Sequence, residues 1–182
     1  MWLLPAKDGP PRRAVRGGYP RWSTNGQTLF VHSRMTSQIL AVSTDDLDAP
    51  PTVFYNKTPG WYYTVSPDEK QVAFGLSGRL EIRDRATGAI MAKWLTPGER
   101  GLLPAWSPDG ALIAFGGFNG TRLGVWVFQV QTGRVGPVRP GLFTMPAWST
   151  DGRGLAFDER VGKTNSVWLV GRPHLDQLLS GR

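Results

Sequence analysis

Few residues in this sequence could carry out chemistry, because it has two histidines and no cysteine. His32 and His174 are far apart along the chain, whereas a metal centre needs several converging ligands. We therefore expect no metal site and no cofactor, with His32 near a strand end and His174 in the C-terminal tail. The Gly-x-Ser-x-Gly motif, which exposes a nucleophilic serine in many hydrolases, is also absent.

Carboxylates are the remaining candidates for catalysis. Asp158 and Glu159 are adjacent and follow a predicted strand, and Glu99 lies in a predicted loop. Glycosidases cleave their substrates with a pair of carboxyl groups, so these residues leave open a glycan-active enzyme. On balance we expect a protein that is not an enzyme. Three other aspartates lie in predicted tight turns, where hydrogen bonds to the backbone explain them: Asp68, Asp109 and Asp151.

The elements that carry these residues repeat along the chain. One phrase occurs four times, with its anchors at Trp22, Val65, Trp106 and Trp148. Successive anchors are 43, 41 and 42 residues apart. Such a constant period is the signature of a repeat architecture. The four copies are RWSTNGQTLFV from Arg21, TVSPDEKQVAF from Thr64, AWSPDGALIAF from Ala105 and AWSTDGRGLAF from Ala147.

Each copy is predicted to form a strand, a tight turn and a second strand. In the turn Ser-Pro-Asp-Gly, proline presets φ, aspartate bonds the backbone and glycine tolerates the conformation that follows. The first copy has Asn25-Gly26, which also favours a turn. The second copy has Glu69 and Lys70 after Asp68, so we expect a slightly different turn there.

Further strands follow each phrase. Weaker fourth strands begin at Ala89 and Arg134, after the turn signals ATG and QTG. Four strands in about 42 residues is the period of a β-propeller blade. The tail from His174 has leucines at helical spacing, and a closing strand is the alternative. The predicted third strands begin at Gln38, Arg79, Leu123 and Ser166.

The phrase PAWSPDGALIAF followed by VWVFQVQTG resembles the WD-like repeat of TolB-type propellers. The same repeat occurs in the propeller domains of prolyl oligopeptidase-type enzymes. The resemblance covers almost the whole chain in four copies, and it is specific for the repeat rather than for an activity. It implies an all-β fold, a β-propeller of four-stranded antiparallel blades. The second copy departs from the pattern, with Val65 in place of tryptophan.

Alignment of the repeats divides the chain into about four full blades and an N-terminal half-blade. Trp2 aligns with Trp126 and Trp168, so the chain is expected to begin in the middle of a blade. The predicted parts are a trailing half-blade over 1–15, blade 1 over 16–57, blade 2 over 58–98, blade 3 over 99–140, and blade 4 with the C-terminal tail over 141–182.

Closure of the propeller is left open by this alignment, and an incomplete ring is one expectation. The chain could be the C-terminal part of a longer propeller, could close with another subunit, or could form a four-bladed body with a rearranged end. Propellers avoid open sheet edges by closing on themselves, so an open arc predicts self-association through those edges.

Composition limits the classes of binding partner that we expect and says little about the cellular compartment. The formal net charge is +7, but the basic residues are scattered, so nucleic acid is not an expected partner. The only apolar run near the N-terminus is Trp2 to Leu4, which does not make a signal peptide, and no transmembrane segment is predicted. The compartment stays unknown; the resemblance adds a periplasmic location as one option if the chain is a fragment.

Binding residues are expected on the face opposite the repeated turns. Loops joining second to third strands, and one blade to the next, vary in length and composition, and such loops on a regular scaffold tend to carry function. Aromatic residues beside arginine are typical of interface anchors. The alternative for Trp61 and Tyr62 is packing between blades. The predicted binding residues are Trp61, Tyr62, Arg100, Phe118, Arg122, Asp158, Arg160 and Lys163.

The sequence therefore predicts a non-enzymatic, TolB-like propeller scaffold that binds a protein or peptide through its loop-rich face or channel. Two alternatives remain at this point. One is the propeller portion of a larger hydrolase or sensor, whose activity is encoded elsewhere. The other is a glycan-active propeller enzyme that uses Asp158 and Glu159.

Overall fold

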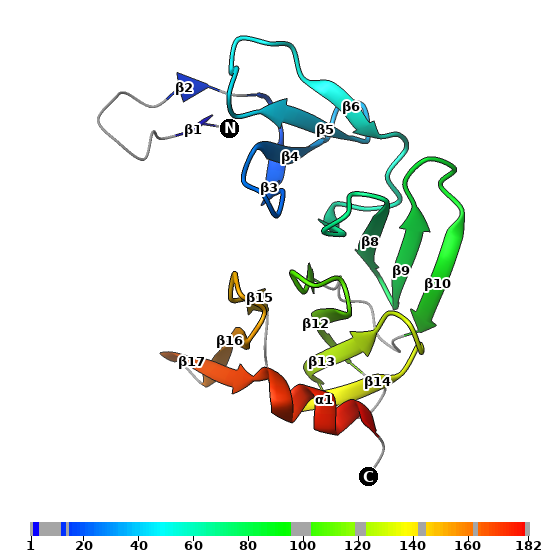
Figure 1. Ribbon diagram of the computed structural model, residues 1–182, viewed down its shortest axis with the longest axis vertical. Coiled ribbons are helices and arrows are strands. Elements are labelled where there is room, and N and C mark those ends of the chain that lie inside the picture. Colours follow the sequence, from blue (N-terminus) through cyan, green and yellow to red (C-terminus); the bar gives the residue numbers. More distant parts are fainter. Residues whose placement is uncertain are drawn as a thin grey trace. The chain divides into compact units, whose positions relative to one another are not determined.

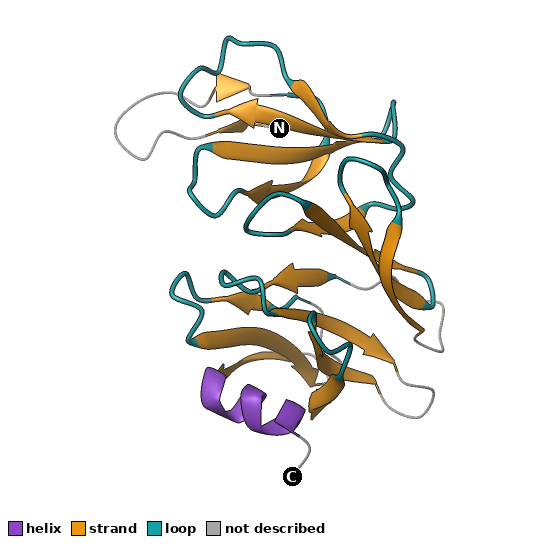
Figure 2. Cartoon of the chain, turned by 45° about the vertical axis from the view of Figure 1, so that its right-hand side comes forward, coloured by secondary structure: helices purple, strands orange, loops and turns teal. Residues whose placement is uncertain are grey.

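The computed structural model is built almost entirely of antiparallel strands, with one helix (Figures 1 and 2). Within the described residues no helix is long and apolar enough to cross a membrane. The structure describes residues 2–3, 12–13, 15–95, 103–118, 123–141, 145–161 and 164–180.

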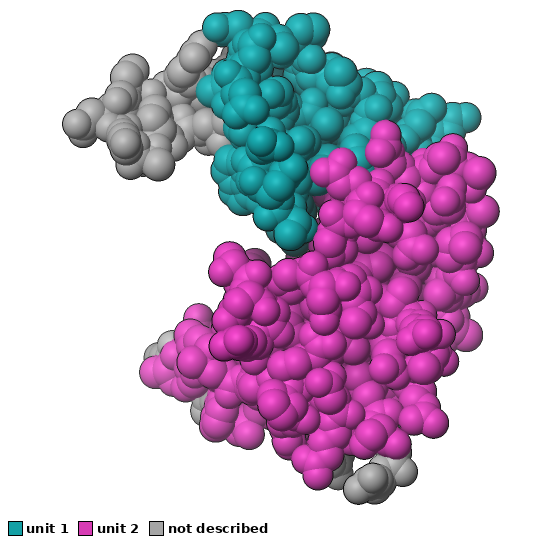
Figure 3. Space-filling model, viewed as in Figure 1, with its two compact units in different colours: residues 1–61 teal, residues 62–182 magenta. Residues whose placement is uncertain are grey.

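The chain separates into two compact units, residues 1–61 and residues 62–182 (Figure 3). In the first unit, β1 (Trp2–Leu3) pairs with β2 (Arg12–Arg13). A four-stranded sheet follows in the order β3-β4-β5-β6. Its strands are β3 (Gly18–Trp22), β4 (Thr28–Ser33), β5 (Gln38–Ser43) and β6 (Thr52–Tyr55).

The second unit contains three sheets and the helix. Two sheets have four strands, in the orders β7-β8-β9-β10 and β11-β12-β13-β14, and the last has three, β15-β16-β17. The first of these contains β7 (Tyr62–Val65), β8 (Gln71–Leu76), β9 (Arg79–Asp84) and β10 (Ile90–Leu95). The others contain β11 (Pro104–Trp106), β12 (Leu112–Phe118), β13 (Leu123–Gln129), β14 (Val135–Pro140), β15 (Ala147–Trp148), β16 (Gly154–Val161) and β17 (Thr164–Gly171).

Alternation along the strands builds a core on each side of the middle sheet of the second unit. On one face of β12, Ile113 and Phe115 pack with Leu80 and Ile82 of β9. On the other face, Leu112 and Ala114 belong to a cluster that includes residues of the last sheet. Successive strand residues point to opposite faces, so each central strand reads as a continuous apolar run. Neighbouring sheets of this unit therefore pack face to face.

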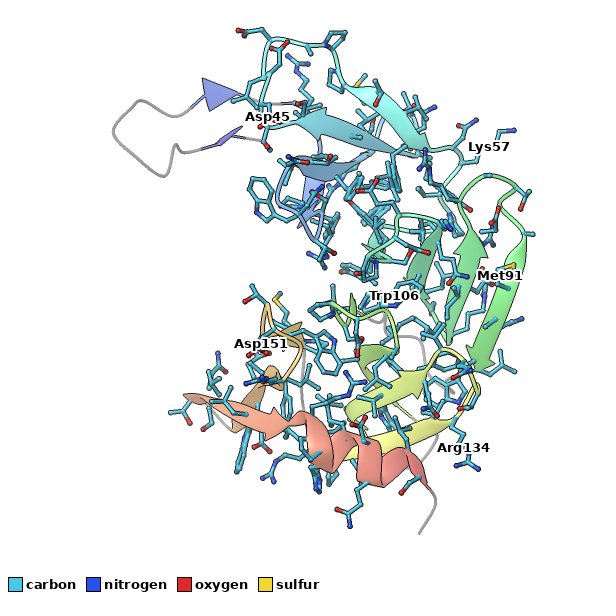
Figure 4. All side chains as sticks on the ribbon, in the orientation of Figure 1. Asp45, Lys57, Met91, Trp106, Arg134 and Asp151 are labelled. Atoms are coloured by element: carbon cyan, nitrogen blue, oxygen red, sulfur yellow. The ribbon has the colours of Figure 1, made fainter. Side chains whose placement is uncertain are left out.

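The repeated phrase forms the same turn in all four copies. The serine hydroxyl donates to the carboxylate or amide oxygen two residues on, at 2.6 to 2.7 Å, as in Ser149 to Asp151. Asp151 is labelled in Figure 4. The serine Oγ also accepts the N–H five residues on, at 2.9 Å. The different turn expected in the second copy is not found, because Glu69 adopts a φ of 59° where Gly110 has 75°. These interactions make the phrase a structural element.

The last sheet ends differently from the other three. After its third strand, β17, the chain turns directly into α1 (Arg172–Ser180), which confirms the helical interpretation of the tail. Leu175 and Leu179 of α1 are buried in the cluster that contains Leu155 and Phe157. The sheets and their strand order confirm the propeller fold class, with the correction that the described part of the last sheet has three strands. Closure of the ring stays a prediction.

Candidate functional site

Three of the eight predicted binding residues have described side chains. Trp61 ends the first unit, Tyr62 begins β7, and Asp158 lies in β16. Phe118 and Arg160 are placed only as backbone near the ends of β12 and β16. Arg100, Arg122 and Lys163 lie outside the described residues, as does Glu99.

Trp61 belongs to an arginine–aromatic cluster in the first unit, together with Tyr19 and Arg34. The Arg34 guanidinium carbon lies 4.9 Å from the centroid of the Trp61 ring and 5.7 Å from that of Tyr19. The two rings stack with centroids 6.4 Å apart and an interplanar angle of 26°. Arg34 Nη2 also donates to the Tyr19 hydroxyl at 3.4 Å. The contact with Arg34 and the stacking on Tyr19 orient the Trp61 ring without covering it, since 52% of its surface remains exposed.

A hydrogen-bond network holds the two loops that carry this cluster together. Thr58 donates its backbone N–H and its hydroxyl to the Ser37 carbonyl, at 2.8 and 3.2 Å. Since the hydroxyl proton is used there, Thr58 Oγ1 must accept from His32 Nε2, 2.9 Å away. These bonds attach the connection after β6 to the β4–β5 turn, which contains Arg34. Trp61 and Arg34 are therefore positioned by neighbouring, mutually bonded loops.

His32 is a buried, neutral part of this network. Burial, and then the nearby charge of Arg34, lower the pKa of His32 below its ordinary value of 6.5. With Nε2 protonated, Nδ1 is an acceptor, and it has no hydrogen-bond partner within the described part of the chain. The sequence interpretation of His32 as a strand residue agrees with its place in β4. Its role here is to hold Thr58.

Tyr19 reaches the cluster through an irregular strand. The pairing of β3 with β4 shifts register between Gly18 and Arg21, and Tyr19 has a φ of 54°, which is uncommon for a residue other than glycine. Bulges of this kind re-aim side chains and occur near functional sites. The strained backbone is therefore what turns the Tyr19 ring towards Trp61.

A second arginine–aromatic cluster lies in the second unit. The guanidinium carbon of Arg139, on β14, lies 3.6 Å from the centroid of the Trp168 ring, on β17. Trp168 Nε1 donates to Glu159 Oε2 at 2.6 Å, and Arg139 Nε lies 3.7 Å from the same oxygen. Glu159 is thereby engaged with the indole and the guanidinium. This cluster connects the last two sheets, and we interpret it as a contact that stabilises their packing.

The adjacent carboxylates Asp158 and Glu159 are not brought together. They are neighbours in β16, so their side chains project to opposite faces of the sheet. Asp158 Oδ1 accepts the Met145 N–H at 3.1 Å, while Glu159 binds Trp168. These two positions do not present the facing pair that glycoside hydrolysis uses. Among the described residues, no group of three metal-ligating side chains converges either.

Sequence reasoning missed Arg34 and Tyr19, although the repeat contains a signal for one of them. Arg34 precedes Phe118 by 84 residues, the spacing between Trp22 and Trp106, and Phe118 precedes Arg160 by a further 42. The three residues thus occupy equivalent positions in the repeat, of which only the later two were predicted. Tyr19 gave no such signal, because its orientation depends on the register shift in β3.

Comparison with protein-family models and with curated proteins finds no match to the sequence. Solved structures do match. A protein described as TolB from Agrobacterium tumefaciens is 20% identical with a TM-score of 0.61, covering 84% of this chain and 57% of that one. TolB from Acinetobacter baumannii is 19% identical with a TM-score of 0.69, covering 89% and 43%. Hydrazine synthase from Kuenenia stuttgartiensis is 17% identical with a TM-score of 0.57, covering 84% and 50%.

These matches concern the fold. The chain spans about half the length of the structures that it matches. One of the three is named as an enzyme and two as TolB, so the fold by itself does not assign an activity. The strand order, the repeated turn and the similarity to TolB structures agree, and the chain has the fold of a TolB-type β-propeller.

Proposed function

We propose that this chain is a non-enzymatic propeller scaffold that binds a protein or peptide partner through its loop-rich face, with Trp61 as the central anchor. The observation that carries the proposal is an exposed tryptophan held in place by Arg34 and Tyr19. Tryptophan, tyrosine and arginine are the residue types that dominate the binding energy of protein interfaces. A pre-oriented ring also loses little conformational entropy when a partner binds.

The charge of Arg34 favours a partner segment that contains a carboxylate. Arginine has five N–H donors, and the structure gives Arg34 one hydrogen bond within the described residues, to Tyr19. The remaining donors suit an acidic side chain, while the Trp61 ring suits an adjacent apolar or aromatic one. The other binding residues that the sequence indicates stay predictions: Tyr62, Arg100, Phe118, Arg122, Asp158, Arg160 and Lys163.

A peptide library displayed on phage tests this function. Selection against the wild-type chain should enrich peptides that combine an acidic residue with an aromatic or apolar one. Trp61→Ala and Arg34→Ala should each weaken their binding about tenfold or more, because truncating an interface anchor costs about 2 kcal/mol or more and about 1.4 kcal/mol corresponds to a tenfold change in Kd. The measurement is the Kd of synthetic peptides by calorimetry.

The matched control is Trp22→Ala. Trp22 is exposed to 59%, similar to Trp61, but it lies at the repeated-turn end of β3. Binding should survive this change. Failure to enrich any peptide, or equal effects of the Trp22 and Trp61 substitutions, would rule out the proposed anchor.

A further inference from the structure

The outer side of β17 is the place where the repeat is incomplete. In the other three sheets, the third strand is covered by a fourth: β5 by β6, β9 by β10 and β13 by β14. Within the described residues, β17 pairs only with β16. Along its outer side β17 therefore has no strand partner in the described part of the chain, and this side forms an open edge.

The sequence and pairing of β17 lack the features that normally protect such an edge. Its eight residues pair with β16 without a register shift, and they include neither proline nor a charged side chain. The three outer strands differ, since each is joined to its neighbour with a register shift. Lys93 lies in β10, and Pro137 and Arg139 lie in β14. By these criteria β17 is suited to an inner position in a sheet.

One face of β17 is also uncovered, and this feature is separate from its open edge, because the equivalent face of β13 is buried in the cluster that contains Leu155 and Phe157 of the last sheet. Val167 and Leu169 are exposed to 74% and 79%, whereas Val125 and Val127, 42 residues earlier in β13, are fully buried. The helix α1 does not cover them. It packs beside Leu155 and Phe157, which project from the opposite face of the sheet. An apolar strand that is open at its edge and on one face is a strong pairing surface.

We infer that two copies of this chain associate by antiparallel pairing of β17 with its equivalent in the second copy. The occupant must be a β-strand, because that is what covers the third strand in every other sheet. A two-fold axis through the middle of β17 makes the edge self-complementary. The strand is uncharged, so the pairing places no like charges opposite one another. The two three-stranded sheets then form one continuous sheet, in which Val167 and Leu169 of both copies share a face.

Sedimentation over a range of protein concentrations tests this inference with a charge swap at Val167. The wild type should show a reversible monomer–dimer equilibrium. Val167→Lys and Val167→Glu should each raise the dimer Kd about tenfold or more, because like charges face each other across the two-fold axis. An equimolar mixture of the two variants should restore the dimer. The side chain is exposed, so neither substitution should alter the thermal unfolding of the monomer.

Val53→Lys is the matched control, since Val53 is an exposed valine on the outer strand β6. It should leave the dimer intact. A wild-type chain that stays monomeric up to millimolar concentration overturns the inference, and so does a dimer that Val167→Lys leaves unchanged or a mixture that fails to recover. A strand from another protein as the natural occupant would give the first of these results.

Cysteine cross-linking locates the contact directly, because the chain has no cysteine of its own. Val167→Cys should form a disulfide-linked dimer under mild oxidation, whereas Val53→Cys should not. Equal cross-linking at both positions would count against pairing through β17. Trp61→Ala should dimerise like the wild type, so this inference and the proposed peptide binding fail or succeed separately.

Discussion

Glu81 is the most deeply buried carboxylate of the described residues, with 2% of its surface exposed. It lies between Arg79 and Arg83, two residues before and after it on the same face of β9. Arg79 Nε donates to one carboxylate oxygen at 2.6 Å, and Arg83 donates to the other at 2.7 and 3.0 Å. Burial alone would raise the pKa of Glu81, but the bonds from the two arginines outweigh it and lower the pKa below 4.5.

Glu81→Gln should therefore destabilise the fold at neutral pH, by about 2–4 kcal/mol, because it leaves two arginines without their shared partner. A lowered pKa contributes stability that is fully present above the ordinary value and is lost as the pH falls through the folded-state pKa. The difference between wild type and variant should consequently shrink from pH 7 to pH 3. Urea unfolding at both pH values measures it.

Asp45→Asn is the control for this substitution, because it makes the same carboxylate-to-amide change on an exposed side chain (Figure 4). It should change the free energy of unfolding little at pH 7. A loss of stability in Glu81→Gln that is equal at pH 7 and pH 3 would show that the carboxylate charge is not what stabilises this site.

At the scale of elements, the repeated turn imposes one backbone conformation on its fourth residue, whatever the type of that residue. Gly26, Gly110 and Gly152 have φ values of 74°, 75° and 71°, and Glu69 is held at 59° in the equivalent position. The Ser66–Asp68 bond and the bond from Glu69 N–H to the Ser66 carbonyl are the same as in the other copies. The network thus forces a left-handed conformation that costs a side-chain-bearing residue about 1–2 kcal/mol.

Glu69→Gly should accordingly stabilise the protein by about 0.5–1 kcal/mol, since relief of strain exceeds the added entropy of the unfolded chain. The reverse change, Gly26→Ala, should destabilise it by a similar or larger amount. A Cβ at Gly26 meets no atom within 4 Å, so the backbone conformation alone is tested there. Thermal unfolding measures both, and a destabilised Glu69→Gly variant would contradict the explanation.

At the scale of the whole molecule, net charge acts against association of two copies. Each chain carries a formal charge of +7, while β17 itself carries none. Repulsion between the copies is screened by salt, and the contact through β17 is apolar and backbone-based, so salt should strengthen the dimer.

Raising the ionic strength from about 0.05 to about 0.5 M, across which the Debye length falls severalfold, should lower the dimer Kd. Peptide binding through Arg34 should respond in the opposite direction, because it pairs unlike charges. Sedimentation and calorimetry over the same salt series compare the two. A dimer that weakens with salt would indicate an interface held by ion pairs instead of β17.

Much of the architecture could be predicted because it is local and repeated. The serine–aspartate turn is closed by residues within five positions of each other, and it recurs every 42 residues or so, which indicated strands, turns and propeller class. Of the candidate site, Trp61 could be predicted as an aromatic residue in a variable loop. Its partners depend on which loops hydrogen-bond to one another, and no local pattern contains that information.

The sequence by itself thus determined the repeat, its strands and its turns, because alternation and turn chemistry act over a few residues. Tertiary structure alone decided that Arg34 and Tyr19 orient Trp61, since a bond between Thr58 and Ser37 and a shifted register in β3 bring them together. It also decided that β17 is exposed. Val167 has the same residue type and the same position in the repeat as Val125. Only the strands that lie next to each residue explain why Val125 is buried and Val167 is exposed.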